Sequence, residues 1–256
     1  MIIKKSPAEI EAMKEAGRVS AKVLREAGRI VEPGISTLEI DSFVERMIRL
    51  EGGIPSFKGL YGFPGSICAS VNDQIVHGIP SANVILKEGD ILSIDTGATV
   101  DGWVGDNAWT YPVGKVSPEV EHLLEVTEKC MWAGLDAARV GNRLGDIGYA
   151  VQSLAEAQGY GVVREYVGHG VGHVMHEDPN VPNFGHKHTG IHLEAGMVLA
   201  IEPMINMGTY KTKQMADGWT VVTRDRKPSA HFEKMVAITE EGPVIITTEP
   251  DHKRPV

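Results

Sequence analysis

The sequence has few cysteines, no long apolar run and no excess of positive charge. Cys68 and Cys130 are the only cysteines among 256 residues and form no CxxC pair, which argues against a disulfide scaffold and a thiolate zinc site. No stretch is apolar for long enough to span a bilayer, and the first residues turn polar too soon for a signal peptide. The formal net charge of −9 argues against an extended nucleic-acid interface. We expect a cytoplasmic protein with neither a membrane nor a nucleic acid as partner.

The same series of sequence features occurs twice along the chain, in the same order. A Ser-Pro pair opens a helical pattern at positions 6–7 and again at 117–118, since proline behind a serine cap starts helices. A His-Gly pair and a strand ending on a carboxylate follow in each half, in EGDILSID and AGMVLAIE. The alternative interpretation is that two unrelated α/β segments share these features by chance. We predict one α+β domain over residues 1–256, with halves at about 6–112 and 117–248, inner antiparallel strands, outer helices and a site between the halves.

Two aspartates in SIDTGATVDGWVGDNAWT follow apolar, strand-like residues. Burying an unpaired carboxylate costs on the order of several kcal/mol, so both positions require an explanation. The pair Asp101-Gly102 is a preferred centre for a two-residue hairpin turn. With that turn, Asp95 and Asp106 lie on the same face as diagonal neighbours. A three-residue loop would instead place them on opposite faces.

Three further segments place metal-ligand residues beside apolar runs. His169 lies in GHGVGHVMHEDP, Glu202 ends the strand in VLAIEP, and Glu233 precedes a strand in HFEKMVAITEEG. One such carboxylate alone usually signals a salt bridge. Four of them with one imidazole exceed what nearby lysines or arginines neutralise, which predicts a metal site. The set suits two adjacent five- or six-coordinate ions such as Mn²⁺, Fe²⁺ or Co²⁺, with zinc as an alternative.

These motifs, together with VNDQIVHGIP, resemble the methionine aminopeptidases of the pita-bread superfamily over nearly the whole chain. The ligands of that family correspond in order to Asp95, Asp106, His169, Glu202 and Glu233. The close spacing of Glu202 and Glu233 leaves no room for the type II insertion, and the chain has no room for the N-terminal domain of prolidases. The resemblance is therefore to the short bacterial type I form, and it implies an internally duplicated pita-bread fold.

The resemblance also implies which metal ion each ligand binds and which ligand transfers protons. Asp106 and Glu233 would bridge the two ions, while Asp95 would belong mainly to one ion and His169 with Glu202 to the other. A metal-bound hydroxide would attack the scissile carbonyl. Glu202 would take its proton and pass it to the departing amine.

Two histidines complete the catalytic set that the resemblance implies. His176 would donate to the scissile carbonyl oxygen, and His77 would approach the scissile nitrogen. The sequence leaves the roles of His173 and His231 open. The stretch after position 168 is rich in histidine. Its other histidines are expected at the surface, namely His186, His188 and His192.

An apolar pocket for the methionine side chain is a further implication. Its positions carry Phe57, Leu60, Phe63, Cys68, Met175 and Trp219. Family members often have tyrosines at positions 60 and 63 and phenylalanine at 175. Met204 is expected near the pocket mouth, Cys68 as a buried small apolar residue and Cys130 in a helix core.

The implied activity is removal of the initiator methionine from nascent polypeptides whose second residue is small. The implied partners are those N-termini and the ribosome near its exit tunnel, and the implied assembly state is a monomer. A proline-specific aminopeptidase of the same fold is one alternative. A non-catalytic binding module is the other.

Overall fold

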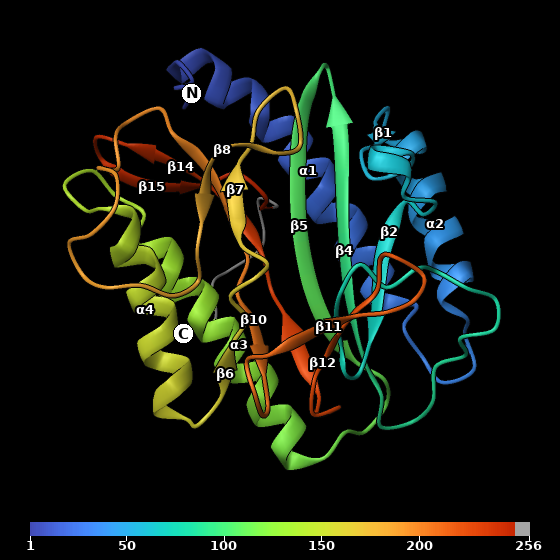
Figure 1. Ribbon diagram of the computed structural model, residues 1–256. Coiled ribbons are helices and arrows are strands. Elements are labelled where there is room, and N and C mark those ends of the chain that lie inside the picture. Colours follow the sequence, from blue (N-terminus) through green and yellow to red (C-terminus); the bar gives the residue numbers. More distant parts are fainter. Residues whose placement is uncertain (249–256) are drawn as a thin grey trace.

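The central feature of the fold is a long hairpin, β4 (Ile91–Val100) and β5 (Trp103–Pro112), with helices behind it (Figure 1). The structure is a computed structural model that describes residues 1–248. The helices of this part are α1 (Pro7–Arg29), α2 (Thr37–Leu50), α3 (Pro118–Ala137) and α4 (Leu144–Ala157), with a 3₁₀ turn at Leu60–Gly62. Among these residues, no helix combines the length and the apolar character needed to span a membrane.

The strands pair antiparallel throughout residues 1–248. One sheet has the order β1-β4-β2 with β5 on β4, and a second has the order β15-β14-β9-β7-β8. Two smaller sheets have the orders β13-β10-β6 and β11-β12-β3. The short strands are β1 (Ile54–Pro55), β2 (Ile67–Val71), β3 (Gln74–Val76), β6 (Gly161–Val162), β7 (Gly168–Gly170), β8 (Glu177–Val181), β9 (Val198–Ile201), β10 (Met204–Asn206), β11 (Thr212–Gln214), β12 (Val221–Thr223), β13 (Ser229–His231), β14 (Lys234–Thr239) and β15 (Gly242–Ile245).

Both predicted Ser-Pro helix starts are confirmed. Ser6 accepts a hydrogen bond from the Glu9 amide, and the Glu9 carboxylate accepts one from the Ser6 amide, so a complete capping box precedes α1. Ser117 caps α3 by accepting a hydrogen bond from the amide of Val120. A pair of helices followed by strands thus occurs twice in the chain. This order supports the predicted division into similar halves, which stays a prediction.

The hairpin has the predicted register. Asp95 pairs with Ala108, and Asp106 pairs with Gly97, on either side of a two-residue turn. Both turn residues have positive φ, 49° at Asp101 and 80° at Gly102, as a type I′ turn requires. The DG pair therefore sets which face carries the two carboxylates.

Helix α1 approaches the hairpin closely beside the metal-ligand candidates. A Cβ atom on Gly105 would lie 2.2 Å from the carbonyl oxygen of Ala16, so only glycine lets the helix backbone come this near. A buried polar chain reinforces the contact: the Asn107 amide donates to Ser20 Oγ at 2.6 Å, and Ser20 donates to the Thr96 carbonyl at 3.1 Å. Helix α1 thus supports the backbone on both sides of Asp106.

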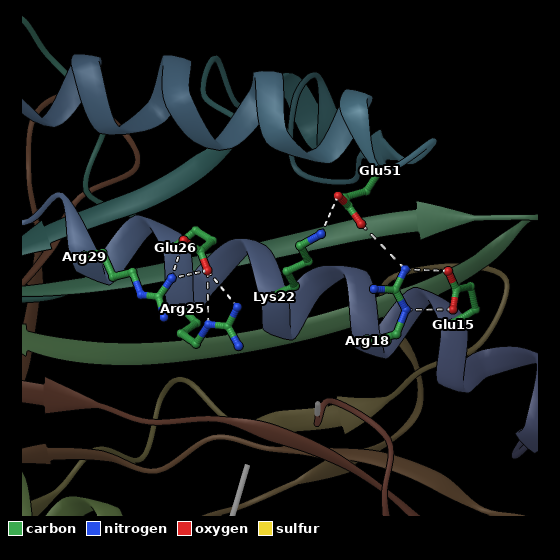
Figure 2. A network of polar contacts seen from close by, with 7 residues as sticks. All are labelled: Glu15, Arg18, Lys22, Arg25, Glu26, Arg29 and Glu51. Atoms are coloured by element: carbon green, nitrogen blue, oxygen red, sulfur yellow. Dashed lines mark hydrogen bonds and ion pairs between the residues drawn. The ribbon is translucent and has the colours of Figure 1, made fainter. Parts of the chain in front are cut away.

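The outward face of α1 carries ion pairs instead of apolar contacts (Figure 2). Glu51, which follows α2, accepts from Lys22 at 2.7 Å and lies 3.6 Å from Arg18. Glu26 pairs with Arg25 and Arg29 on the same helix. Exposed pairs of this kind contribute about 0–1 kcal/mol each. The buried face, not the charged one, therefore holds α1 in place.

Strand β5 joins the two larger sheets. The Glu233 amide donates to the Ala108 carbonyl at 2.9 Å, and the Val104 amide donates to the Gly172 carbonyl at 3.0 Å. On the outer side, α3 and α4 form a core cluster with residues of β9 and β14. Segments from the second half of the sequence are thereby placed against the hairpin of the first.

Replacing Gly105 with Ala tests the close packing of α1. The added methyl group would overlap the Ala16 backbone, so we expect the free energy of unfolding to fall by about 1–3 kcal/mol. Chemical denaturation measures the change. Gly185→Ala is the matched control, because its Cβ would meet its nearest atom at an ordinary 3.4 Å. Equal stability of the two variants would contradict the packing argument.

Candidate metal centre and substrate cavity

A cavity of about 720 Å³ lies where the hairpin meets the second half of the chain. All five predicted metal ligands line it: two come from the hairpin and three from β7 and the ends of β9 and β14. They are Asp95, Asp106, His169, Glu202 and Glu233. The predicted ligand set is thus brought together from segments far apart in the sequence.

Local structure explains how the second half aims its ligands. Glu202 lies directly after β9, where Pro203 interrupts the strand, and its carbonyl accepts a hydrogen bond from the Asn183 amide group at 3.1 Å. Glu233 lies between β13 and β14 and is fixed by its own backbone hydrogen bond to β5. Both carboxylates therefore lie on backbone that hydrogen bonds hold in place.

Three of the five residues form the tightest group. Ligand atoms of Asp106, His169 and Glu233 lie within 4.8 Å of one another. His169 Nε2 is 3.6 Å from Asp106 Oδ2 and 3.5 Å from Glu202 Oε1. Its Nδ1 donates to the Gly170 carbonyl at 2.9 Å, which leaves Nε2 as an acceptor facing carboxylates. Such a tautomer is the one that binds a metal ion.

Burial raises the pKa of every carboxyl group in this set. The pKa values of Asp95, Glu202 and Glu233 lie well above their usual range, first because of burial and then because of the neighbouring carboxylates. Burial raises the pKa of Asp106 to about 7 and lowers that of His169 to about 4. Neighbouring imidazoles therefore stay neutral near pH 7 and do not offset the negative charge.

The donor set fits a bound cation. Within residues 1–248, Asp95 Oδ1, Asp106 Oδ1 and Glu233 Oε1 are buried without a hydrogen-bond partner. Buried polar atoms are normally paired, and carboxylate oxygens with one imidazole are the ligands that divalent first-row ions accept. A cation between these oxygens would give each of them a partner and would offset the repulsion between the carboxylates.

The two predicted catalytic histidines lie in the same cavity. The His176 ring packs edge-on against that of His169, with 4.4 Å between centroids, and its Nδ1 is 3.5 Å from Tyr61 Oη. His77 packs edge-on against Tyr166 and Trp219, at 5.6 and 6.4 Å. Burial lowers the pKa of both histidines, so each is neutral at pH 7.

One wall of the cavity is apolar. Five of the six predicted pocket residues line it, and Phe63 packs edge-on against Trp219 at 5.1 Å between ring centroids. The five are Phe57, Leu60, Phe63, Cys68 and Trp219. The sixth, Met175, packs in the same apolar cluster, close enough that a Cβ on Gly97 would come within 2.8 Å of its methyl group.

The expectation for Met204 is wrong. Its side chain is 0% exposed and packs with Ile75, Val163 and Val221 instead of lying at the pocket mouth. Strand β10, which carries Met204, pairs with β13 and β6, so the side chain faces a separate apolar cluster.

The expected burial of both cysteines is confirmed. Cys68 and Cys130 are buried, and burial raises the pKa of both thiols. Cys130 lies on the inner face of α3. Neither thiol is therefore suited to act as a thiolate near neutral pH.

The remaining histidines divide clearly. His186, His188 and His192 are exposed, as expected. His173, whose role the sequence left open, stacks on Trp103 with 3.7 Å between centroids and donates to the Gly102 carbonyl. His231 is buried, and its Nε2 lies 3.6 Å from Glu202 Oε2 with no hydrogen-bond partner among residues 1–248. Burial lowers the pKa of His231 to about 3.

Several cavity residues were not predicted from the sequence. Tyr61 has a positive φ of 51° and is largely exposed at the rim, over His176. Its place between two glycines in GLYG was the available signal. Glu177 adjoins His176 and Tyr166 lies three residues before His169, but no spacing or repeat distinguishes them. The other unpredicted lining residues are Val76, Glu165, Val167, Asp178 and Asn180.

Comparison with known proteins assigns the family. The model of the metallopeptidase family M24 matches residues 11–240. The chain belongs to the metallopeptidase family M24. This M24 chain is 54% identical to methionine aminopeptidase 1 of Bacillus subtilis, over 96% of this chain and 99% of that protein.

Solved structures agree with this assignment. The crystal structures of methionine aminopeptidase from Rickettsia prowazekii and Thermotoga maritima each match with a TM-score of 0.95, at 41% and 42% identity. Each match covers 97% of this chain and 100% of the other. The predicted α+β class and pita-bread fold of the M24 chain are confirmed, and a divalent metal ion is its cofactor.

Metal-free protein should lose stability as pH rises above 7. The folded carboxyl groups keep protons that the unfolded chain has already lost, so deprotonating them costs stability. The histidines with lowered pKa values act in the opposite sense, but only below about pH 6.5. Between pH 7 and 8.5 we expect a loss on the order of 1 kcal/mol per pH unit for each carboxyl group that still keeps its proton in the folded state, measured by denaturation with chelator present.

Asp95→Asn provides the control for this pH dependence. The variant removes one of the mutually repelling carboxylates, so its metal-free form should lose less stability over the same pH range. Identical slopes for the two proteins would contradict the assignment of the repulsion to this cluster.

Proposed function

We propose that this protein is a metal-dependent methionine aminopeptidase, which removes the initiator methionine from polypeptides whose second residue is small. One observation supports this proposal above the others. A single cavity joins the carboxylate–imidazole cluster, two neutral histidines and an apolar wall. Relatives at 46–54% identity over at least 93% of this chain bear the name methionine aminopeptidase.

The cofactor in this proposal is a pair of divalent ions, Mn²⁺, Fe²⁺ or Co²⁺, with zinc as an alternative. Asp106 and Glu233 would be shared, with Asp95 on one side and His169 with Glu202 on the other. Five ligands with four carboxylates exceed the needs of one tetrahedral ion. When bound, such ions lower the pKa of water enough to supply hydroxide near neutral pH.

Glu202 is suited to move the proton in this reaction. Its two oxygens are distinguished by their neighbours, with Oε1 near His169 and Oε2 near His231. Burial keeps His231 neutral. Its imidazole can therefore donate a hydrogen bond from Nε2 to the Glu202 carboxylate without adding a positive charge. Glu202 would accept a proton from the attacking water and release it to the departing amine.

His176 and His77 would act on the scissile peptide bond. Nδ1 of His176 faces Tyr61 at the rim, so Nε2 is the atom that donates to the carbonyl oxygen as negative charge develops there. His77 would approach the scissile nitrogen from the side of Tyr166 and Trp219. Both act as neutral donors, because burial lowers their pKa values.

The apolar wall would bind the methionine side chain. Phe57, Leu60, Phe63, Cys68 and Trp219 line this part of the cavity, with Met175 packed into the same cluster. An unbranched side chain fits along such a wall, whereas charged side chains would lose hydration there. Leu60 and Phe63 lack the hydroxyl groups common in the family, so selection rests on shape and apolar contact.

The setting of this activity follows from its substrate. Initiator methionine appears on nascent chains at the ribosomal exit tunnel, so the proposed partners are those N-termini and the ribosome. The proposed location is the cytoplasm, and the proposed assembly state is a monomer, in which the cavity needs no residue from another chain.

Peptide cleavage with and without chelator tests the proposed function. Metal-loaded protein should cleave Met-Ala-Ser efficiently, lose this activity in excess chelator and regain it with Mn²⁺ or Co²⁺. Met-Ile-Ser should be a poor substrate by a factor of at least 100, because steric exclusion exceeds the selectivity of one missing methylene. Chromatography of the products measures both.

The same assay distinguishes the alternatives. Faster cleavage of Ala-Pro peptides would assign a proline-specific aminopeptidase. Binding of peptides without any cleavage by metal-loaded protein would assign a binding module. Full activity in metal-free protein would refute the metal-dependent mechanism.

His176→Ala should lower kcat on Met-Ala-Ser by about 10²–10³-fold while bound metal stays nearly constant, as for other oxyanion donors. His192→Ala is the control, because His192 is exposed and outside the cavity lining. Metal analysis accompanies the kinetics. A loss of metal in the His176 variant would assign this residue to the ligands instead.

A further inference from the structure

A buried ion pair outside the metal centre connects the N-terminal segment to the cavity. Lys5 Nζ lies 2.5 Å from Glu177 Oε2, and the two side chains are only 3% and 6% exposed. Lys5 Nζ also donates to the Ile3 carbonyl at 3.1 Å. Glu177 lines the cavity and directly follows His176 in the chain.

The surrounding backbone leaves space for this pair. A Cβ on Gly172 would lie 2.1 Å from Glu177 Oε1 and 2.9 Å from Lys5 Cε, so the absence of a side chain there is required. Buried ion pairs contribute little net stability, and apolar residues of similar volume often replace them without loss. Stability alone therefore does not explain the arrangement.

The two ends of the pair are anchored to different parts of the site. The Lys5 amide donates to the Gly196 carbonyl at 2.7 Å, and Ser6 caps α1, which packs against the hairpin that carries Asp95 and Asp106. Glu177 opens β8. The ion pair thus links the scaffold of the hairpin ligands to the segment that carries His176.

The backbone before His176 has other restraints, since His173 stacks on Trp103 and Met175 is buried in an apolar cluster. The His176 side chain itself is held less firmly, because its ring packs edge-on against His169 alone among the metal-ligand candidates. The imidazole of His176 approaches Tyr61 only at the length of a weak hydrogen bond, 3.5 Å. A donor that must meet a developing charge needs tighter placement than these contacts provide.

We propose that Lys5 is a positioning residue, which fixes the oxyanion donor His176 through Glu177. The proposal rests on the proposed function, in which His176 donates to the scissile carbonyl oxygen. Lys5 touches neither substrate nor metal ligands in this scheme. It acts by holding the first residue of β8.

Kinetics of metal-loaded Lys5→Met, alone and combined with His176→Ala, test the proposal. Lys5→Met should lower kcat on Met-Ala-Ser by about 10-fold to 100-fold, the scale of a displaced catalytic group, with KM nearly unchanged. In the His176→Ala background the same change should have no further effect. Lys4→Met is the matched control, since Lys4 pairs with Glu194 in the neighbouring position but at the surface.

Two outcomes of the kinetics would overturn the proposal. One is an unchanged kcat in Lys5→Met, and the other is an equal loss with and without His176. Should Lys5→Met fail to fold, Glu177→Gln breaks the charge pair from the other side in the same crossed experiment. Its amide oxygen keeps the volume and one acceptor, so the loss should be smaller but should again vanish without His176.

Hydrogen exchange supplies a measurement that does not depend on activity. Amides of residues 172–178 should exchange faster in Lys5→Met than in wild type and unchanged in Lys4→Met. Equal exchange in all three proteins would overturn the positioning role. An inactive wild type with this exchange pattern would refute the proposed function and leave the anchoring of the segment supported.

Discussion

Repulsion between carboxylates buried on one face of the β4–β5 hairpin is the constraint on which the structure depends. The hairpin register puts Asp95 and Asp106 on the same face, and Glu202 and Glu233 add charge from the second half. Neutral histidines cannot balance this charge, so the carboxylates must either keep protons or share a cation. The close approach of α1 and the hydrogen bond from Glu233 to β5 hold the repelling groups together.

Burial acts on the imidazoles of the cavity in a complementary way. The pKa values of His77, His169, His176 and His231 all fall, chiefly because burial disfavours their charged forms. A neutral imidazole can bind a metal ion through one nitrogen and donate a proton through the other. The same low-polarity surroundings that make the carboxylates costly thus keep four histidines in the form that the proposed chemistry uses.

The parts that the sequence predicted are those governed by short-range rules. The DG turn sets the register of Asp95 and Asp106, and the Ser-Pro pairs set two helix starts, because each depends on a few neighbouring residues. Positions beside apolar runs indicated the ligands His169, Glu202 and Glu233, and the long family motifs agree with this set. The positions of these residues in the cavity agree with that prediction.

What the sequence did not predict depends on contacts between distant segments. Nothing near Met204 in the chain indicates that β10 turns it toward Ile75 and Val221. No motif or spacing distinguishes Lys5 and Glu177 in the sequence, and their buried contact beside Gly172 is seen only in the packed structure. Such pairings require the packed structure, since no periodicity or motif records which partner a side chain will meet.

The spread of the ligands along the chain has a consequence for biosynthesis. Asp95 and Asp106 share a hairpin whose strands pair locally, but Glu233 reaches them through contacts between distant segments, such as the hydrogen bond between its amide and Ala108. Contacts between residues so distant in sequence form late, because closing the intervening loop has an entropic cost. During synthesis the hairpin therefore emerges before Glu202 and Glu233, when the carboxylate ligand set is still incomplete. Metal uptake would then be among the last steps of maturation, and metal supply would control how much of the newly made protein becomes active.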